Sequence, residues 1–319
     1  MHQVGALSPL ITVTSLTEMQ NTHLEHPEDS ILTGDMSVLD WFVTEGRLSL
    51  KIDGSPAIVW GRNPATGNFF VGTKSVFNKV KIKINESHED IDNNHTGPVA
   101  EILHLCYDYL PRTPYIIQGD FIGVGGSDEY QPNTITYVFP SVIRETIIIA
   151  PHTYYDAEDD LRNAVSRPLS FSLTDTHDCK FIKPQAWIAF GADRFDDMNE
   201  VVAFAKQMST TCEFVSDKQA REMKKVINSF IKSGADLDEE ALVLACGCDV
   251  NLIRLWKLVK SIKDDCLTLC RNNGPVAYVG YDRIDAEGYV YANEFGTFKL
   301  VKREAFSRAN FNSGRFQTR

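Results

Sequence analysis

The sequence has no run of about 20 apolar residues, which is the length that a helix needs to cross a bilayer. Residues 1–18, MHQVGALSPLITVTSLTE, also lack the basic start and the apolar stretch of a secretion signal. There is no surplus of positive charge, because 32 Lys and Arg stand against 43 Asp and Glu, a net charge of −11. We therefore expect a soluble cytoplasmic protein without a membrane partner, in which only a local basic patch could bind a polyanion.

Cysteine is scarce and odd in number, with seven in 319 residues, which favours reduced thiols over a disulfide framework. Four cysteines form two close pairs, Cys246 with Cys248 and Cys266 with Cys270. The C-x-C spacing is narrower than that of most zinc sites, and both pairs lie in segments with helical apolar periodicity. We expect buried structural cysteines and no structural zinc.

The apolar periodicity predicts an α+β fold with an antiparallel core and one helical insertion. The expected parts are an N-terminal helical segment (1–45), a core (46–195), a helical insertion (196–272), the return of the core (273–306) and a basic tail (307–319). Within the core, the pattern predicts a hairpin over 47–75, a helix over 98–110, and strands over 114–122, 134–150, 179–190 and 276–302.

The segment Lys51-Ile52-Asp53-Gly54 is the first with evident chemical potential. A lysine with a neutral amine is a nucleophile, and a pocket with nearby positive charge lowers the lysine pKa. On a regular strand Asp53 would share a face with Lys51, and Gly54 marks a turn. Because K-x-D-G arises by chance in many proteins, this segment alone indicates only an exposed strand lysine before a turn.

Five further segments follow in order, most of them on predicted strands. They are Gly72-Thr73-Lys74-Ser75, Ile117-Gln118-Gly119-Asp120-Phe121-Ile122-Gly123, Thr136-Tyr137-Val138-Phe139, Ala286-Glu287-Gly288-Tyr289-Val290 and Phe298-Lys299-Leu300-Val301-Lys302. Together the six segments resemble motif I, the basic segment that follows it in RNA ligases, and motifs III, IIIa, IV and V of the covalent nucleotidyltransferases. That superfamily contains the ATP-dependent DNA and RNA ligases and the mRNA capping enzymes. The chain is also similar to ligase-like proteins of tailed phages, which would place it in the host cytoplasm.

This resemblance implies a fold and a reaction. The fold would be a ligase-type nucleotidyltransferase, with ATP-grasp-like antiparallel sheets flanking a nucleotide pocket. Lys51 would attack the α-phosphorus of ATP, release pyrophosphate and become lysyl-AMP. Because charge builds on phosphate oxygens in this step, positioned cations and Mg²⁺ or Mn²⁺ would supply most of the catalysis.

The same resemblance assigns roles to the other motif residues. Lys299 and Lys302 would hold the α-phosphate, and Lys74 the outgoing or incoming phosphate. Gly54 and Asp120 would line the nucleotide site, with Asp120 accepting a ribose hydroxyl where a glutamate is usual. Tyr137 or Phe139 would stack on the base. Glu287 and Asp53 would bind the metal through oxygen, the donor that a hard cation prefers.

The sequence departs from the family pattern in three places. Ser55-Pro56-Ala57 stands where many ligases have an arginine two residues after the motif I glycine. Lys299 and Lys302 are three residues apart and would face opposite sides of a regular strand. Residues 303–319 are too few for a C-terminal OB-fold with motif VI, so polynucleotide contacts must come from elsewhere.

Two basic segments and a partner are candidates for those contacts. Lys79, Lys81 and Lys83 would share one face of a strand and could follow a polynucleotide backbone. The insertion carries its own lysines, Lys224, Lys225, Lys257 and Lys260, and could replace part of the OB-fold or serve only as a stabilising decoration. A protein partner supplying the OB-fold function is a third source.

Three functions remain open at this point. The first is an ATP-dependent polynucleotide ligase or 5′-end adenylating enzyme that joins 5′-phosphate and 3′-OH ends, with RNA as the expected substrate. The second is a nucleotidyltransferase-derived binding module without catalysis. The third is a GTP-dependent capping-type guanylyltransferase.

Overall fold

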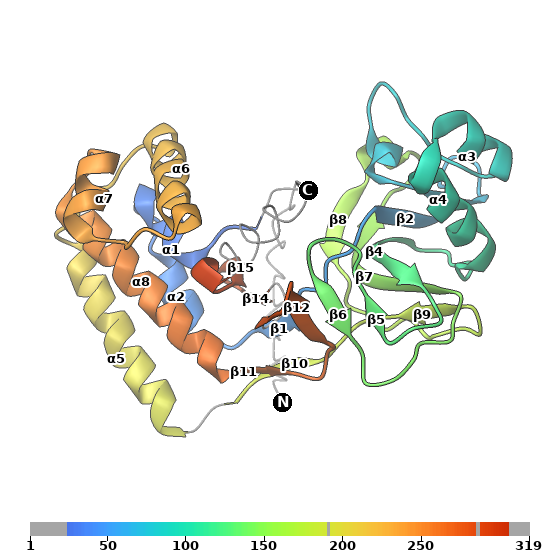
Figure 1. Ribbon diagram of the computed structural model, residues 1–319. Helices are drawn as coiled ribbons and strands as arrows, with labels where there is room; N and C mark the ends of the chain where they lie inside the picture. The colour runs from blue at the N-terminus through green and yellow to red at the C-terminus, as the bar shows by residue number, and fades with distance from the viewer. Residues whose placement is uncertain (1–23, 190–191, 285–287, 306–319) are drawn as a thin grey trace, which may run out of the picture.

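The computed structural model describes residues 24–189, 192–284 and 288–305, and the side chains of 192–195 are not described. The fold is α+β, as expected. Figure 1 shows a helical body on one side, a large sheet with its own helices on the other, and smaller sheets between them. None of the helices in these ranges is long and apolar enough to span a membrane.

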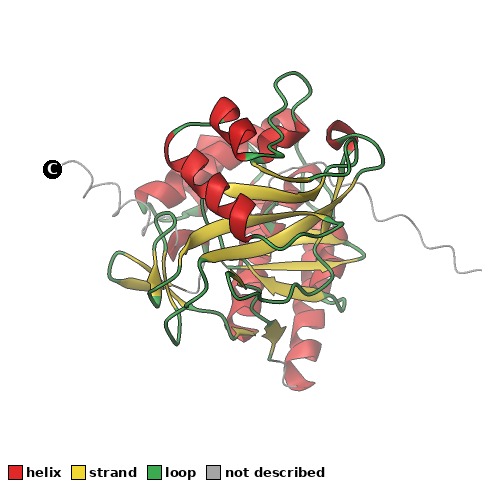
Figure 2. Cartoon of the chain, turned by 90° about the vertical axis from the view of Figure 1, so that its right-hand side faces the viewer, coloured by secondary structure: helices red, strands yellow, loops and turns green. Residues whose placement is uncertain are grey.

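The large sheet has six strands in the order β3-β2-β4-β7-β8, with β9 pairing in parallel to β7 and the other pairs antiparallel. Its strands are β2 (Ala57–Arg62), β3 (Phe69–Gly72), β4 (Ile116–Val124), β7 (Ile147–Asp156), β8 (Val165–Pro168) and β9 (Cys179–Phe181). Helices α3 (His88–Asn94) and α4 (Gly97–Tyr109) lie over its outer face (Figure 2). The expected helix over 98–110 is therefore confirmed as α4.

Strand alternation gives the large sheet two different faces. On the outer face, Trp60, Ile117 and Ile149 pack with Leu103 and Cys106 of α4 in a closed apolar core. On the inner face, β4 carries the polar Gln118 and Asp120 before the apolar Ile122. The polar side chains of β4 thus face the rest of the molecule, where the candidate site lies.

A three-stranded antiparallel sheet faces the large one, in the order β1 (Arg47–Leu50), β14 (Tyr289–Asn293) and β15 (Gly296–Leu300). Leu50, Tyr289 and Leu300 lie side by side and are buried. The next row in the register is more exposed and consists of Ser49, Val290 and Lys299. Lys299 therefore points away from the buried side of this sheet.

Two small sheets complete the strands. One pairs β10 (Ala186–Ile188) with β11 (Cys270–Asn272), and the other has the order β13 (Asp282–Ile284), β12 (Val276–Val279), β6 (Thr136–Val138) and β5 (Glu129–Tyr130). Since β10 precedes the helical insertion and β11 follows it, their pairing holds the two ends of the insertion together.

The insertion consists of four helices, namely α5 (Ala192–Ser209), α6 (Asp217–Ser233), α7 (Glu239–Cys246) and α8 (Val250–Leu269). Side chains of Ser216, Asp238 and Asp249 cap the last three by accepting backbone N–H bonds, and α6 has a full capping box. Gly234 and Gly247 end α6 and α7 with φ of 70° and 62°, a backbone conformation that favours glycine.

The N-terminal segment is built into this helical body. It forms α1 (Pro27–Ser30), the 3₁₀ turn η1 (Ile31–Thr33) and α2 (Ser37–Phe42). Ile31 and Leu32 are fully buried in one core with Trp256 of α8. The insertion is therefore not self-contained, because its core includes the start of the described chain.

Three expected strand segments are divided in the structure. One, over 179–190, becomes β9 in the large sheet and β10, which pairs with β11. The other two are the hairpin over 47–75 and the strand over 134–150. The hairpin over 47–75 splits, since β1 joins β14 whereas β2 and β3 pair in the large sheet. The strand over 134–150 becomes β6 and β7, which belong to different sheets. Both breaks occur at prolines, Pro56 and Pro140, whose missing N–H weakens a continuous ladder.

Candidate functional site

The segment Lys51–Pro56 is the crossover between the two main sheets. The Lys51 N–H donates to the Gly288 carbonyl (3.0 Å) and so extends the β1–β14 pairing by one residue. Four residues later the Ser55 N–H donates to the Phe121 carbonyl of β4 (2.9 Å), and the Phe121 N–H donates to the Pro56 carbonyl (3.0 Å). The motif I residues are thus fixed at both ends, each end to a different sheet.

Gly54 is required by the closeness of this crossover to β4. A Cβ at position 54 would lie 2.2 Å from the Phe121 carbonyl oxygen, which is backbone and cannot move aside. The Gly54 N–H donates to Oδ2 of Asp120 (3.1 Å). The structure therefore brings together Gly54 and Asp120, two of the residues that the sequence predicts for one nucleotide site.

Lys51 and Asp53 lie together on the accessible side of the crossover. Nζ of Lys51 is 2.6 Å from Oδ2 of Asp53, and the side chains are 39% and 29% exposed. The lysine amine can therefore be reached from solvent, and a carboxylate is in place to accept its proton.

Lys299 comes to the same place from β15. Because Ser49 and Lys299 lie in one cross-strand row through Val290, and Lys51 is two residues beyond Ser49, Lys51 and Lys299 share a face. Burial, together with the positive charges of Lys51 and Arg303, lowers the pKa of Lys299. Two lysines on one face can both contact phosphate oxygens, here with Asp53 paired to Lys51 and with Glu25 and Asp29 near Lys299.

Lys302 and Lys74, the other two lysines predicted to hold phosphate, do not share the face of Lys51 and Lys299 in the same regular strand pairing. Lys302 lies past the end of β15 and is exposed. Lys74 is exposed at the first position of the 3₁₀ turn η2 (Lys74–Phe77), whose N-terminus the Thr73 side chain caps. Of the three lysines, Lys299 is the one that the structure places near Lys51.

Tyr137 does not have the role that its motif predicts. Its ring is fully buried, so it offers no face to a base, and its hydroxyl accepts the Asp53 N–H (3.0 Å). Asn133 donates from Nδ2 to the Asp53 carbonyl (3.3 Å). Of the two aromatic candidates only Phe139 is partly accessible, with its edge toward Tyr130.

Removing the Tyr137 hydroxyl should destabilise the crossover. In Tyr137→Phe the buried Asp53 N–H loses its acceptor, so we expect the free energy of unfolding to fall by about 1–3 kcal/mol. Urea unfolding measures this loss, and Tyr281→Phe, at a fully exposed ring, is the matched control. Equal stability of the two variants would show that the Tyr137 hydroxyl does not hold Asp53.

Asp120 has a second neighbour that the sequence did not single out. Its Oδ1 is 3.6 Å from Nε2 of His152, which follows two residues after Ala150, the β7 partner of Asp120. His152 was missed because its place depends on the β4–β7 register, which a bulge shifts. With one oxygen on Gly54 and the other toward His152, Asp120 links the crossover to β7.

The predicted metal ligands are only partly described. Glu287 lies outside the described residues, and Asp53 offers one carboxylate, the oxygen donor that Mg²⁺ prefers. The described part of the chain holds no cluster of three His, Cys, Asp or Glu side chains arranged around a metal position. The chemistry of Asp53 fits Mg²⁺, and a set of three or more such side chains would have to include residues outside that part.

The predicted basic strand over Lys79, Lys81 and Lys83 is wrong. Residues 79–84 are bends and irregular backbone, so the three lysines share no strand face. Lys83 is held by donating from Nζ to the Asn94 carbonyl at the end of α3 (2.8 Å). The alternation K-V-K-I-K failed as a strand signal because neither β2 nor β3 continues a ladder onto it.

The two cysteine pairs lie far apart. Cys246 ends α7 and Cys248 precedes α8, whereas Cys266 and Cys270 lie at the other end of α8. Sixteen helical residues span about 24 Å, so the four thiols cannot share one zinc ion. Burial raises the pKa of both Cys266 and Cys270 to about 12, as expected for inert thiols.

A separate cavity lies behind the three-stranded sheet. It has a volume of about 340 Å³ and is lined mainly by apolar side chains, including Leu48, Trp187, Met198 and Leu300. Leu300 belongs to the buried side of β15, opposite Lys299. An apolar lining does not suit a triphosphate, so this cavity is not a candidate for the nucleotide that the sequence resemblance implies.

His26, next to this site, should make the protein sensitive to acid. Burial, and then the charges of Arg303 and Lys299, lower the pKa of His26 far below its usual value of 6.5. Below pH 6.5 the His26 imidazole is protonated in the unfolded chain but stays neutral in the folded chain. The free energy of unfolding should therefore fall by up to about 1.4 kcal/mol for each pH unit below this point.

Urea unfolding between pH 7.5 and pH 4.5 would measure the slope. The His26→Gln variant should lose that part of the slope, whereas His177→Gln, at a 97% exposed side chain, should keep it. Identical slopes in wild type and His26→Gln would show that His26 is protonated in the folded state.

Comparison with known proteins gives one match. Residues 21–246 and 246–315 match the family of unknown function DUF6267. The chain belongs to that family. No curated protein and no solved structure matched the chain. The two matched segments meet at Cys246, the last residue of α7, and together they cover the helical insertion as well as the strands.

Proposed function

We propose that this DUF6267 protein is an ATP-dependent polynucleotide ligase or 5′-end adenylating enzyme, with RNA ends as substrate, acting through a lysyl-AMP intermediate. The observation that supports this best is the meeting of Lys51, Asp53 and Lys299 at the crossover between two antiparallel sheets, anchored by Asp120. Four of the six segments that resemble nucleotidyltransferase motifs contribute to this one place. Two antiparallel sheets on either side of it agree with a ligase-type fold.

The first step would join Lys51 to the nucleotide. Asp53 Oδ2, 2.6 Å from Nζ, is placed to take the amine proton, and the neutral amine then attacks the α-phosphorus of ATP. The new N–P bond forms as the bond to the pyrophosphate oxygen breaks. Lys299 would offset the charge that builds on the α-phosphate oxygens, and bound Mg²⁺ would supply further charge stabilisation.

The second step would transfer AMP to a polynucleotide 5′-phosphate. A phosphate oxygen attacks the same phosphorus, the N–P bond breaks, and Lys51 regains its proton. In a full ligase the 3′-OH of a second end then displaces AMP. Release of the 5′-adenylated end before that displacement would make the protein an adenylating enzyme.

Intact mass after incubation with nucleotide and Mg²⁺ tests this proposal. We expect a gain of one AMP with ATP and no gain with GTP. A gain of one GMP would instead indicate a capping-type guanylyltransferase. No gain with either nucleotide would favour a binding module that has lost the chemistry.

A further inference from the structure

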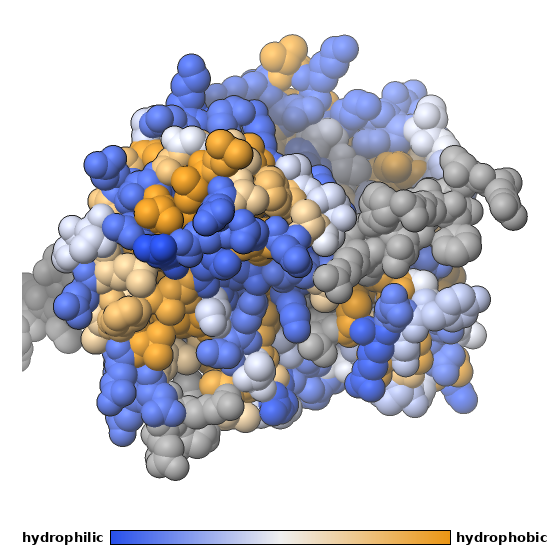
Figure 3. All heavy atoms as spheres, turned by 60° about the vertical axis from the view of Figure 1, so that its left-hand side comes forward, coloured by the Kyte–Doolittle hydropathy of each residue, from blue (hydrophilic) through white to orange (hydrophobic). Residues whose placement is uncertain are grey.

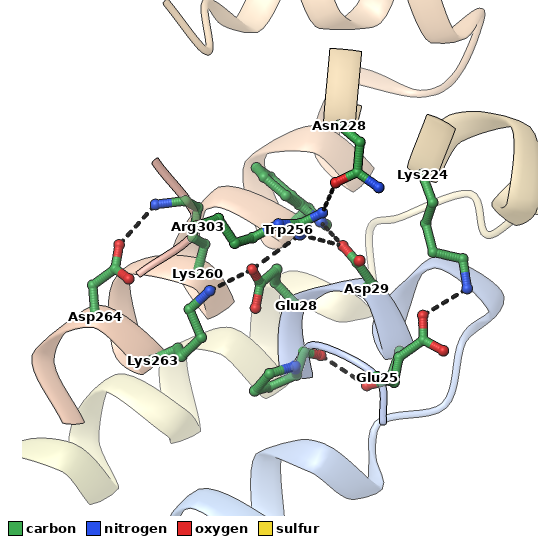
Figure 4. A network of polar contacts seen from close by, with 12 residues as sticks. Glu25, Glu28, Asp29, Lys224, Asn228, Trp256, Lys260, Lys263, Asp264 and Arg303 are labelled. Carbon is green, nitrogen blue, oxygen red and sulfur yellow. Dashed lines mark hydrogen bonds and ion pairs between the residues drawn. The ribbon is translucent and has the colours of Figure 1, made fainter. Parts of the chain in front are cut away.

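The helical body holds a buried cluster of charged residues next to the strand that carries Lys299. Figure 4 shows its members converging from α1, α6, α8 and the segment after β15. All four charged residues are at most 5% exposed, namely Glu28, Asp29, Lys263 and Arg303. Nζ of Lys263 lies 2.6 Å from Oε1 of Glu28, deep between α8 and α1.

Arg303 links the three parts of the cluster. Its Nη1 donates to Glu28 (3.1 Å) and Asp29 (2.9 Å), and its Nη2 donates to Oδ1 of Asn228 on α6 (2.5 Å). Trp256 of α8 donates from Nε1 to the same Asp29 oxygen (2.9 Å). The planar guanidinium thus fixes the chain four residues beyond Lys299 to both the N-terminal segment and the insertion.

A second set of contacts fixes Lys299 itself. Its N–H donates to the Glu25 carbonyl (3.1 Å), so the N-terminal segment borders β15. The Glu25 side chain is in turn held by Lys224 of α6 (2.6 Å). Glu304, next to Arg303, pairs with Lys260 of α8 (2.6 Å).

These contacts change what the insertion can do. Lys224 and Lys260 are engaged with Glu25 and Glu304, Lys225 pairs with Glu222, and Lys257 donates to the Leu237 carbonyl. The helical side shows apolar patches broken up by hydrophilic ones (Figure 3). These four lysines therefore do not form a continuous basic track for a polynucleotide.

We propose that the insertion acts through Arg303 and Glu25, which position Lys299 in the candidate nucleotide site. The effect on catalysis rests on the proposed function, whereas the contacts that hold Lys299 do not depend on it. Arg303 and Glu25 are positioning residues, since neither would touch the nucleotide. In this arrangement the insertion takes part in catalysis by fixing a phosphate-binding lysine, without contacting the polynucleotide.

The Arg303→Met variant tests the proposal. Glu28 keeps Lys263 and Asp29 keeps Trp256 in this variant, so we expect it to fold. Hydrogen exchange at the Lys299 amide should accelerate about tenfold relative to other core amides, because the bond to Glu25 loosens. Lysyl-AMP formation at saturating ATP should slow by about tenfold or more, with a smaller change in the half-saturating ATP concentration.

Two further variants separate positioning from charge and from general stability. Arg303→Lys keeps the charge but not the planar fork, so it should not restore either readout. Arg254→Met breaks an exposed pair with Glu239 between α7 and α8 and should match wild type in both. If Arg303→Met does not fold, Lys224→Met releases Glu25 at a partly exposed site and should give the same faster exchange at Lys299.

The outcomes are distinct. Wild-type exchange at Lys299 in folded Arg303→Met, or in Lys224→Met when Arg303→Met does not fold, would overturn the positioning role, as would full rescue by Arg303→Lys. If wild type forms no lysyl-AMP, the proposed function fails, while the exchange measurements still decide whether Arg303 and Glu25 position Lys299.

Discussion

Replacing Lys51 with alanine should abolish transfer of AMP to the protein. The side chain is the only nucleophile that the crossover presents next to Lys299 among the residues described, and a methyl group cannot form the N–P bond. Lys51→Arg should be equally inactive, because a guanidinium keeps its proton. Labelling with ATP that carries a radioactive α-phosphate measures the transfer directly.

The fold should survive the Lys51→Ala change. The Lys51 contact with the Gly288 carbonyl is made by backbone, and the side chain is 39% exposed, so the stability loss should stay below about 1 kcal/mol. Lys225→Ala, which removes an exposed lysine of α6 outside the predicted motifs, is the matched control and should retain labelling. Full labelling of folded Lys51→Ala would assign the nucleophile to another residue.

Much of the site could be predicted from the sequence because its parts are local. The K-x-D-G segment, the strand around Asp120 and the strand ending at Leu300 each carry their own pattern of apolar and polar residues. The resemblance of these segments, in order, to nucleotidyltransferase motifs is what associated Lys51, Gly54, Asp120 and Lys299. The structure places all four around one crossover.

The parts that could not be predicted depend on contacts between distant segments. A strand pattern has the same period whatever its partner, so nothing in RLSL shows that β1 pairs with β14, 241 residues away in the case of Ser49 and Val290. The buried hydroxyl of Tyr137 and the place of His152 depend on such pairings as well. The segment with Lys79, Lys81 and Lys83 shows the opposite case. It alternates like a strand, but no neighbouring strand in the described part of the chain pairs with it.

The buried cluster was also invisible in the sequence. Glu28, Asp29 and Arg303 read as ordinary surface charges near the two ends of the described chain, and Lys263 as one lysine of an amphipathic helix. They became buried because α1 and the segment after β15 both pack on α8. Burial of a charge depends on tertiary contacts that apolar periodicity does not report.

The second large effect that we expect is on stability, from Lys263→Met. Methionine fills similar space but leaves Glu28 and Asp29 to share Arg303, with one buried negative charge uncompensated. Breaking a buried ion pair in this way costs about 3–5 kcal/mol, a large part of the free energy of unfolding of a typical domain. The urea midpoint should fall accordingly, without a change in the slope of the transition.

A matched pair of variants shows whether this loss comes from the unpaired charge. Glu28→Gln combined with Lys263→Met removes both charges, and it should recover most of the lost stability, because the amide can still accept from Arg303. Lys225→Met breaks an ion pair whose side chains are 73% and 64% exposed, and it should cost less than about 1 kcal/mol. If the double variant is as unstable as Lys263→Met, the loss comes from packing around position 263. If Lys263→Met is no worse than Lys225→Met, Arg303 alone satisfies the buried side chains of Glu28 and Asp29.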